Sequence, residues 1–121
     1  MLKKEDFCVT ADYTMIEVME VIERNRERGV VVVGENGKVC GFVSQGDIIE
    51  AVIAGKSIHS RIDKIINCSF IYLKEKNYDR ALEYFRNRNL SIIPIINDEQ
   101  ELIDIISAKD MFTQVELRKD N

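Results

Sequence analysis

Short apolar runs and a helical spacing of apolar residues alternate along the start of the chain. The run Phe7-Cys-Val-Thr10 and the β-branched run Val30–Val33 are typical of strands. Between them, apolar residues have the spacing i, i+3, i+4, i+7 that places them on one face of a helix: Met15, Val18, Met19 and Ile22. Thr14 and Glu17 fit a capping box, so we expect the helix to begin after Thr14 and to end near Gly29.

The chain is then expected to reverse direction. Asn36-Gly37 is a strong signal for a two-residue hairpin turn, and Val39–Val43 has the pattern of the returning strand. Ser44 opens a second helix that is expected to stop at Gly55 and to carry the apolar residues Ile48, Ile49, Val52 and Ile53. The first half of the chain is therefore predicted to form a β-α-β-β-α unit.

The same pattern returns 63 positions later without a gap. Phe70–Leu73 repeats the first strand, Pro94–Ile96 the buried strand, and Asn97–Gln100 the turn. The helical face of the first unit maps onto Tyr78, Ala81, Leu82 and Phe85. A Ser-x-x-Asp motif opens the last helix of each unit, as Ser44/Asp47 and again as Ser107/Asp110.

Repetition of a whole unit predicts that each copy leaves apolar surface that the other copy covers. We therefore expect an α+β fold of two tandem β-α-β-β-α repeats, packed back to back with pseudo-twofold symmetry. The predicted boundaries are residues 2–57 for the first repeat, 58–67 for a linker, 68–115 for the second repeat and 116–121 for a polar tail.

Composition narrows the class of protein. The 121 residues are 45% hydrophobic and 31% charged, which is globular composition and enough for one ordinary domain. With a net charge of −4, the chain lacks the excess of basic residues that is typical of a nucleic-acid-binding protein. The sequence also lacks an apolar run of about 20 residues and the apolar core of a signal peptide. We expect a cytoplasmic protein with neither a nucleic-acid nor a membrane partner.

Residues suited to metal binding or catalysis are few. Cys8, Cys40 and Cys68 show no C-x-x-C spacing, and His59 is the single histidine, so no metal site is expected. The cysteines are interpreted as small buried hydrophobic residues. The sequence has no Ser/His/Asp set, Cys/His pair or Gly-rich phosphate loop, and we expect that the protein is not an enzyme.

Two segments carry a resemblance to a known family. They are the strand-turn-strand run Val30–Ile48 in the first repeat and, in the second, Ser91–Asp98 continued by Ile106–Met111. The segment Ile62–Asn67 is similar to the inter-repeat segment of the same family. Over residues 2–115 the chain resembles a CBS-domain pair, the Bateman module. Within that family it is similar to pairs fused to sugar-nucleotide transferases or sugar-phosphate isomerases.

The resemblance implies a fold, a ligand class and a role. CBS pairs form a disc-like module of two units that is often dimeric, so a homodimer is expected here. Many bind AMP, ADP, ATP or S-adenosylmethionine in the cleft between the repeats. They generally regulate an attached or partner protein and have no catalysis of their own, so the resemblance allows a fused or partner enzyme here.

The Ser-x-x-Asp motifs fit such a ligand. The first amides of a helix favour anions, so a phosphate could lie near them, and an ionised carboxylate can accept from both hydroxyls of a ribose. The resemblance gives Asp47 and Asp110 the ribose role and Ser44 and Ser107 a supporting one. Lys109, at a helix N-terminus where a cation is unfavourable, hints at an anion. The adenine positions that the resemblance implies are Val9, Thr10, Val30 and Val31 in the first repeat, and Tyr72, Ile92, Ile93 and Pro94 in the second.

Each of these features also has a purely structural interpretation. Ser-x-x-Asp makes an ordinary capping box worth about 1 kcal/mol, and Lys109 can be a solvated surface residue. At the level of function, two alternatives stay open. The chain can be an architectural dimerisation module without a ligand, or the regulatory part of a sugar nucleotidyltransferase or sugar-phosphate isomerase.

Overall fold

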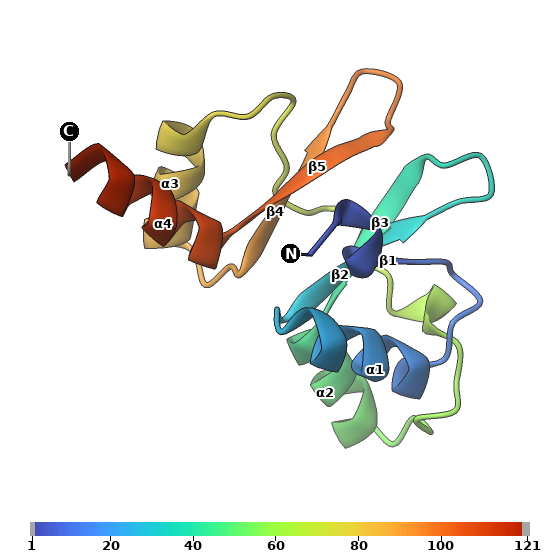
Figure 1. Ribbon diagram of the computed structural model, residues 1–121. Helices are drawn as coiled ribbons and strands as arrows, with labels where there is room; N and C mark the ends of the chain where they lie inside the picture. The colour runs from blue at the N-terminus through green and yellow to red at the C-terminus, as the bar shows by residue number, and fades with distance from the viewer. Residues whose placement is uncertain (1, 120–121) are drawn as a thin grey trace.

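The computed structural model describes residues 2–119, with side chains as far as residue 113. The first half holds a short 3₁₀ helix and five further elements: η1 (Lys4–Phe7), β1 (Cys8–Val9), α1 (Met15–Asn25), β2 (Gly29–Val33), β3 (Val39–Ser44) and α2 (Gln45–Ile53). A second 3₁₀ turn, η2 (Ile62–Lys64), precedes α3 (Tyr78–Asn87), β4 (Ile92–Ile96), β5 (Leu102–Ser107) and α4 (Ala108–Lys119). The two helix pairs lie on the outer sides of the molecule, and the sheets lie between them (Figure 1).

The two sheets repeat the same strand pairing. In the first, β2 is parallel to β1 and antiparallel to β3, and Val32 pairs with Gly41. In the second, β4 is antiparallel to β5, and Ile95 pairs with Asp104 at the equivalent position. Both hairpins have a register shift at the residue that follows this pair. The predicted α+β fold of two tandem repeats is confirmed.

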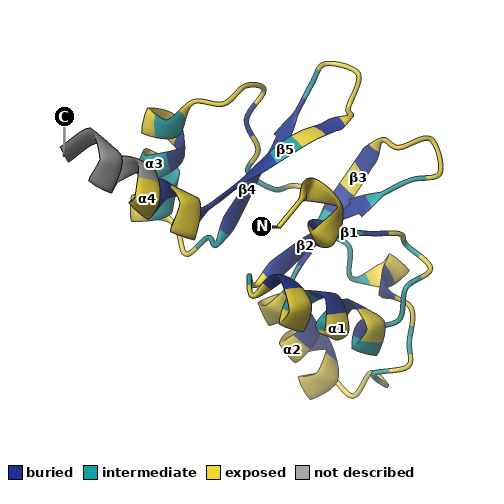
Figure 2. Ribbon diagram, viewed as in Figure 1, coloured by how far each residue is buried: buried dark blue, intermediate teal, exposed yellow. Residues whose placement is uncertain are grey.

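Side chains alternate along the central strands between two apolar layers. In β2, Val30 and Val32 face α1 and α2 of their own repeat, whereas Val31 faces the other repeat. In β4, Ile93 and Ile95 face their own helices. This alternation follows from the period of two along a strand, and Figure 2 shows the resulting dark, buried strands between largely exposed helix surfaces.

A shared apolar layer joins the two repeats. It consists of Phe7, Val31 and Val39 from the first repeat and Ile92, Ile96, Leu102 and Ile105 from the second, all buried. Val39 and Leu102 are equivalent positions of the two repeats, as the predicted pseudo-twofold packing requires. Burial of each such side chain contributes about 1.5–3 kcal/mol, so neither repeat's sheet would keep this energy alone.

Both helices of the first repeat differ from their predicted form. α1 ends at Asn25 instead of near Gly29, because Arg26 adopts a left-handed conformation with a φ of 62°. Its buried face continues from Val18 to Val21, while Met19 and Ile22 are only half-buried. In α2, Ile48 and Ala51 are buried, but the other apolar residues of this helix, Ile49, Val52 and Ile53, are exposed. The helix has the sheet on one side only, so a single narrow stripe reaches the core.

The strand predicted at Phe70–Leu73 is absent; within the described chain this segment makes only an isolated parallel bridge between Leu73 and Ile95. Leu73 donates to the carbonyl of Pro94 at 3.0 Å and accepts from Ile96 at 2.8 Å. Extension of this ladder toward Ile71 would require an N–H at residue 94, which proline lacks. Pro94 therefore limits the pairing to one bridge.

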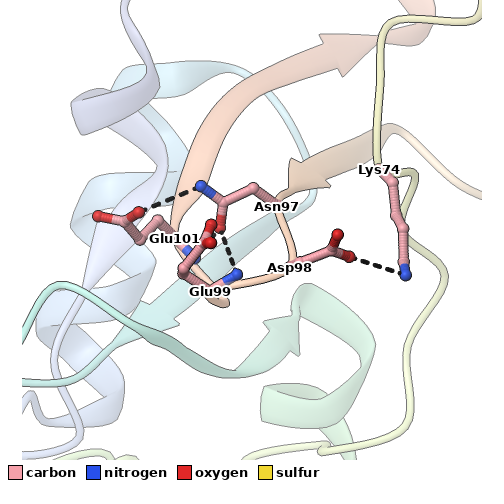
Figure 3. Close-up of polar contacts among 5 residues, drawn as sticks. All are labelled: Lys74, Asn97, Asp98, Glu99 and Glu101. Carbon is pink, nitrogen blue, oxygen red and sulfur yellow. Dashed lines mark hydrogen bonds and ion pairs between the residues drawn. The ribbon is translucent and has the colours of Figure 1, made fainter.

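Both hairpin turns are longer than the predicted two-residue turn. In the first, Gly37 donates to Gly34 at 3.0 Å and has a φ of 77°, whereas Asn36 does not have a positive φ, so this is not the expected type I′ turn. In the second, Gln100 donates to Asn97 at 3.0 Å with a φ of 65°. The side-chain oxygen of Asn97 accepts from the amides of Glu99 and Glu101 (Figure 3).

The segment predicted as the linker, residues 58–67, lies against the first repeat. Ile62 is fully buried in the core of that repeat and donates to the carbonyl of Tyr13 at 2.9 Å. Of the predicted polar tail, 116–121, the backbone of residues 116–119 forms the end of α4, and residues 120–121 lie outside the described residues.

The left-handed Gln100 generates a stability prediction. A left-handed conformation costs an L-residue about 1–2 kcal/mol, whereas glycine pays only its larger loss of chain entropy, about 0.5–1 kcal/mol. We expect Gln100→Gly to raise the free energy of unfolding by about 0.5–1 kcal/mol in urea titrations, and Gly37→Ala to lower it. A loss of stability in Gln100→Gly would contradict a strained left-handed backbone at this residue.

Candidate functional site

A cavity of about 740 Å³ lies between the repeats at the N-terminus of α4. The second repeat lines it with Lys76, Tyr78, Asp104, Ser107, Lys109 and Asp110, and the first repeat contributes Lys3, Lys4, Phe7 and Glu27. The structure thus brings together the second Ser-x-x-Asp motif, the predicted Lys109 and the start of the chain. The volume lies in the range of small-molecule sites.

The Ser-x-x-Asp motif at this cavity leaves its carboxylate free. The amide of Asp110 donates to Oγ of Ser107 at 3.0 Å, so the serine caps α4. Among the described residues, none donates a hydrogen bond to the Asp110 carboxylate. The side chain of Asp110 is exposed and lines the cavity, and its oxygens can accept hydrogen bonds from a ligand.

The first motif is instead closed on itself. The amide of Asp47 donates to Oγ of Ser44 at 3.0 Å, and the amide of Ser44 donates to Oδ2 of Asp47 at 2.9 Å. This is a complete capping box, the structural interpretation of the motif. Ser44 and Asp47 line neither the 740 Å³ cavity nor the second described one.

The segment that packs against each hairpin also differs between the two repeats. Asn67 forms two 2.9 Å backbone hydrogen bonds with Phe42 of β3, and a Cβ built on Gly41 would lie 2.2 Å from Cγ2 of Ile66. The linker therefore packs directly on β3 of the first repeat at Gly41. In the second repeat, Asp104 takes the position of Gly41, and the equivalent segment 2–4 reaches β5 through Lys4, whose Nζ donates to the carbonyl of Leu102 at 3.1 Å.

Charged groups of both signs line the open cavity. Nζ of Lys76 lies 2.7 Å from Oδ2 of Asp104. Burial tends to raise the pKa of Asp104, but hydrogen bonds from Lys76 and the Ile105 amide outweigh it and hold that pKa below its usual value. The pKa of Glu27 is raised, chiefly by burial and then by the nearby Asp110 carboxylate. The cavity thus places Glu27 of the first repeat near Asp110 of the second.

Most residues predicted for adenine binding lie elsewhere. Val9, Val30, Val31, Ile92, Ile93 and Pro94 are buried in the apolar layers, so a ligand could reach them only through backbone groups in this conformation. Thr10 is exposed and its hydroxyl donates to Asp12. Tyr72 lies in a second cavity of about 580 Å³ near the hairpin turns, beside Phe70. Adenine contacts by these eight residues stay predictions.

Several residues of the cavity are not predicted from the sequence. Asp104 carries a detectable signal, because a carboxylate stands in a strand pattern where the first repeat has Gly41. Lys3, Lys4, Phe7 and Glu27 carry none, because only the packing of the two repeats brings them to the second motif. Tyr78 is predicted on a helical face, and that face does pack on the core of its repeat.

Metal-binding and reactive groups are sparse in the part of the chain that the structure describes. Among these residues, no group of three or more His, Cys, Asp or Glu side chains is placed to hold a metal ion. The prediction of buried cysteines is wrong for Cys40 and Cys68, which are exposed, and Cys8 is half-buried with a pKa raised to about 11, mainly by burial. None of the described helices is long and apolar enough to span a membrane.

Comparison with known proteins gives one consistent family. The model of the CBS domain matches residues 2–54 and again 71–116. An uncharacterised protein of Methanocaldococcus jannaschii is 28% identical over 115 residues, which cover 81% of this chain and 41% of that protein. The chain thus spans less than half the length of this curated relative.

Solved structures show the same fold at low identity. A CBS domain protein from Pyrobaculum aerophilum complexed with AMP has a TM-score of 0.73 at 19% identity, covering 97% of this chain and 99% of that one. The CBS domain pair of protein MJ0100, in complex with 5′-methylthioadenosine and S-adenosylmethionine, has a TM-score of 0.74 at 17% identity, with 90% of each chain covered.

The unequal state of the two motifs predicts unequal effects of the same substitution. Asp47→Ala removes a carboxylate that closes a capping box and should lower the free energy of unfolding by about 1 kcal/mol. Asp110→Ala removes a carboxylate that closes no capping box, so it should lower the free energy of unfolding by less than half of that amount. Urea unfolding of both variants measures the difference, and equal losses would contradict the asymmetry.

Proposed function

This chain belongs to the CBS-domain family, and from that premise we propose that it is a non-catalytic regulatory module that binds an adenosine nucleotide, AMP, ADP or ATP, beside Ser107 and Asp110. The observation that carries the proposal is the free Asp110 carboxylate at a cavity lined by both repeats. A carboxylate with open acceptor positions suits the two hydroxyls of a ribose. The Ser107 hydroxyl and the first amides of α4 lie beside it.

The charges of the cavity favour a phosphorylated ligand. Lys3, Lys4, Lys76 and Lys109 line it from both repeats, and ammonium groups bind phosphate as point charges. The N-terminus of α4 adds a favourable dipole. A neighbour of similar fold is complexed with AMP, and another with a sulfonium compound. Four lysines at one cavity support the phosphate class over a cationic sulfonium for this chain.

A ligand in this cavity would contact both repeats at once. Its walls come from η1 and Glu27 on one side and from β5 and α4 on the other. Binding would therefore stabilise one relative placement of the repeats, and we propose that this placement is what an attached or partner protein in the cytoplasm senses. The partner enzyme named by the resemblance, a sugar-nucleotide transferase or sugar-phosphate isomerase, stays a prediction.

A second candidate function is self-association, and a specific surface favours it. Ile49, Val52 and Ile53 on α2 are 50%, 43% and 80% exposed, and Phe112 on α4 is 69% exposed. Ile49 and Phe112 are equivalent positions of the two repeats. A homodimer that covers these side chains can accompany nucleotide binding, or it can be the whole function if the module is architectural.

Thermal unfolding with AMP, ADP, ATP and S-adenosylmethionine tests the nucleotide proposal. A ligand at 100 times its Kd stabilises by about 2.7 kcal/mol, which raises the Tm by about 10 °C for a domain of this size. We expect the rise with a nucleotide in the wild type and in Asp47→Ala, and its loss in Asp110→Ala. An unchanged Tm with every compound, together with a dimer in light scattering, would favour the architectural function.

A further inference from the structure

An ion pair lies inside the cavity that holds the free Asp110 carboxylate. Nζ of Lys76 is 2.7 Å from Oδ2 of Asp104, and the two side chains are 51% and 39% exposed. A second ammonium approaches from the opposite wall: Lys4 of η1 donates to the carbonyl of Leu102, two residues before Asp104 on β5, and it acts electrostatically on Asp104. One carboxylate therefore lies near lysines from both repeats.

Asp104 has no counterpart in the first repeat, where Gly41 stands at the same position of the hairpin. Aspartate is disfavoured in strands, and Oδ1 of Asp104 accepts from the Ile105 amide at 2.8 Å, a bond that asparagine would also make. The negative charge itself thus has one evident use in the fold, the pairing with Lys76. Exposed ion pairs of this kind add little stability.

Resting on the proposed function, we infer that Asp104 is a specificity-determining residue, because its carboxylate occupies the position of a ligand anion between Lys76 and Lys4. A phosphate that enters the cavity must displace Asp104 from Lys76 and tolerate its negative charge. Asp104 therefore weakens the binding of phosphorylated adenosine compounds and leaves the binding of uncharged adenosine unaffected. The residue sets how strongly the site distinguishes the two classes.

Paired titrations of AMP and adenosine by calorimetry test this inference. Asp104→Asn keeps the size of the side chain and its bond to the Ile105 amide, and removes the charge. We expect it to bind AMP about three- to tenfold tighter than the wild type does, the size expected of a partly exposed charge interaction, with adenosine unchanged. Lys76→Met should weaken AMP binding by a similar factor and also leave adenosine unchanged.

A matched control is a second Lys–Asp pair among the described residues of the second repeat. Lys74 and Asp98 lie 2.9 Å apart at the hairpin turn, with side chains 69% and 78% exposed, and neither lines the 740 Å³ cavity (Figure 3). Asp98→Asn changes the net charge of the chain by the same amount as Asp104→Asn. We expect it to leave the affinities for AMP and adenosine at their wild-type values.

The outcomes separate this inference from the proposed function. If AMP binds and Asp104→Asn changes its affinity no more than Asp98→Asn does, or changes adenosine equally, the inference is overturned and the function stands. If neither compound binds to the wild type or to Asp104→Asn, both are overturned. The inference is supported if Asp104→Asn binds AMP more tightly than the wild type does, while its affinity for adenosine and the affinities of Asp98→Asn stay unchanged.

Discussion

The apolar layer between the two sheets is the constraint on which the rest of the structure depends. Val31, Val39 and Leu102 each lie on a strand whose opposite face packs on helices, so each sheet is complete only when the other repeat covers it. Because this layer fixes the two repeats face to face, it also fixes the segments at its edges. Lys4 and Glu27 reach the N-terminus of α4 only because the layer holds their repeat there.

The duplicated unit has produced two unequal Ser-x-x-Asp motifs, and the segments that pack beside them also differ. Ile66 and Asn67 pack onto β3 at Gly41, where there is room for no side chain. At the equivalent position Asp104 has a side chain with a lysine partner, and the segment that begins the chain contacts β5 through the ammonium of Lys4. The same motif serves as a closed cap in one repeat and presents a free carboxylate to a cavity in the other.

The sequence contained the local structure and the duplication, but not the tertiary arrangement of the cavity. The duplication could be predicted because the same pattern returns after 63 residues. Short-range patterns were enough to predict the helix caps at Thr14 and Ser44 and every predicted strand except one. The prediction of a strand at Phe70–Leu73 is wrong because Pro94 on the neighbouring strand has no backbone N–H to donate. This effect cannot be seen in the sequence of the segment itself. The exposure of Ile53 could not be predicted, because the spacing of apolar residues does not tell which side of a helix finds a neighbour.

If the motif at Asp110 is open to a nucleotide and the motif at Asp47 is closed on itself, the two must differ in occupancy. The decisive quantity is the number of nucleotide molecules bound per chain, from calorimetric titration of the wild-type protein with AMP or with whichever nucleotide raises its Tm most. We expect one molecule per chain. Two molecules per chain would contradict the asymmetry, because the second would have to bind at Ser44 and Asp47, whose polar groups already bond to each other in a closed capping box.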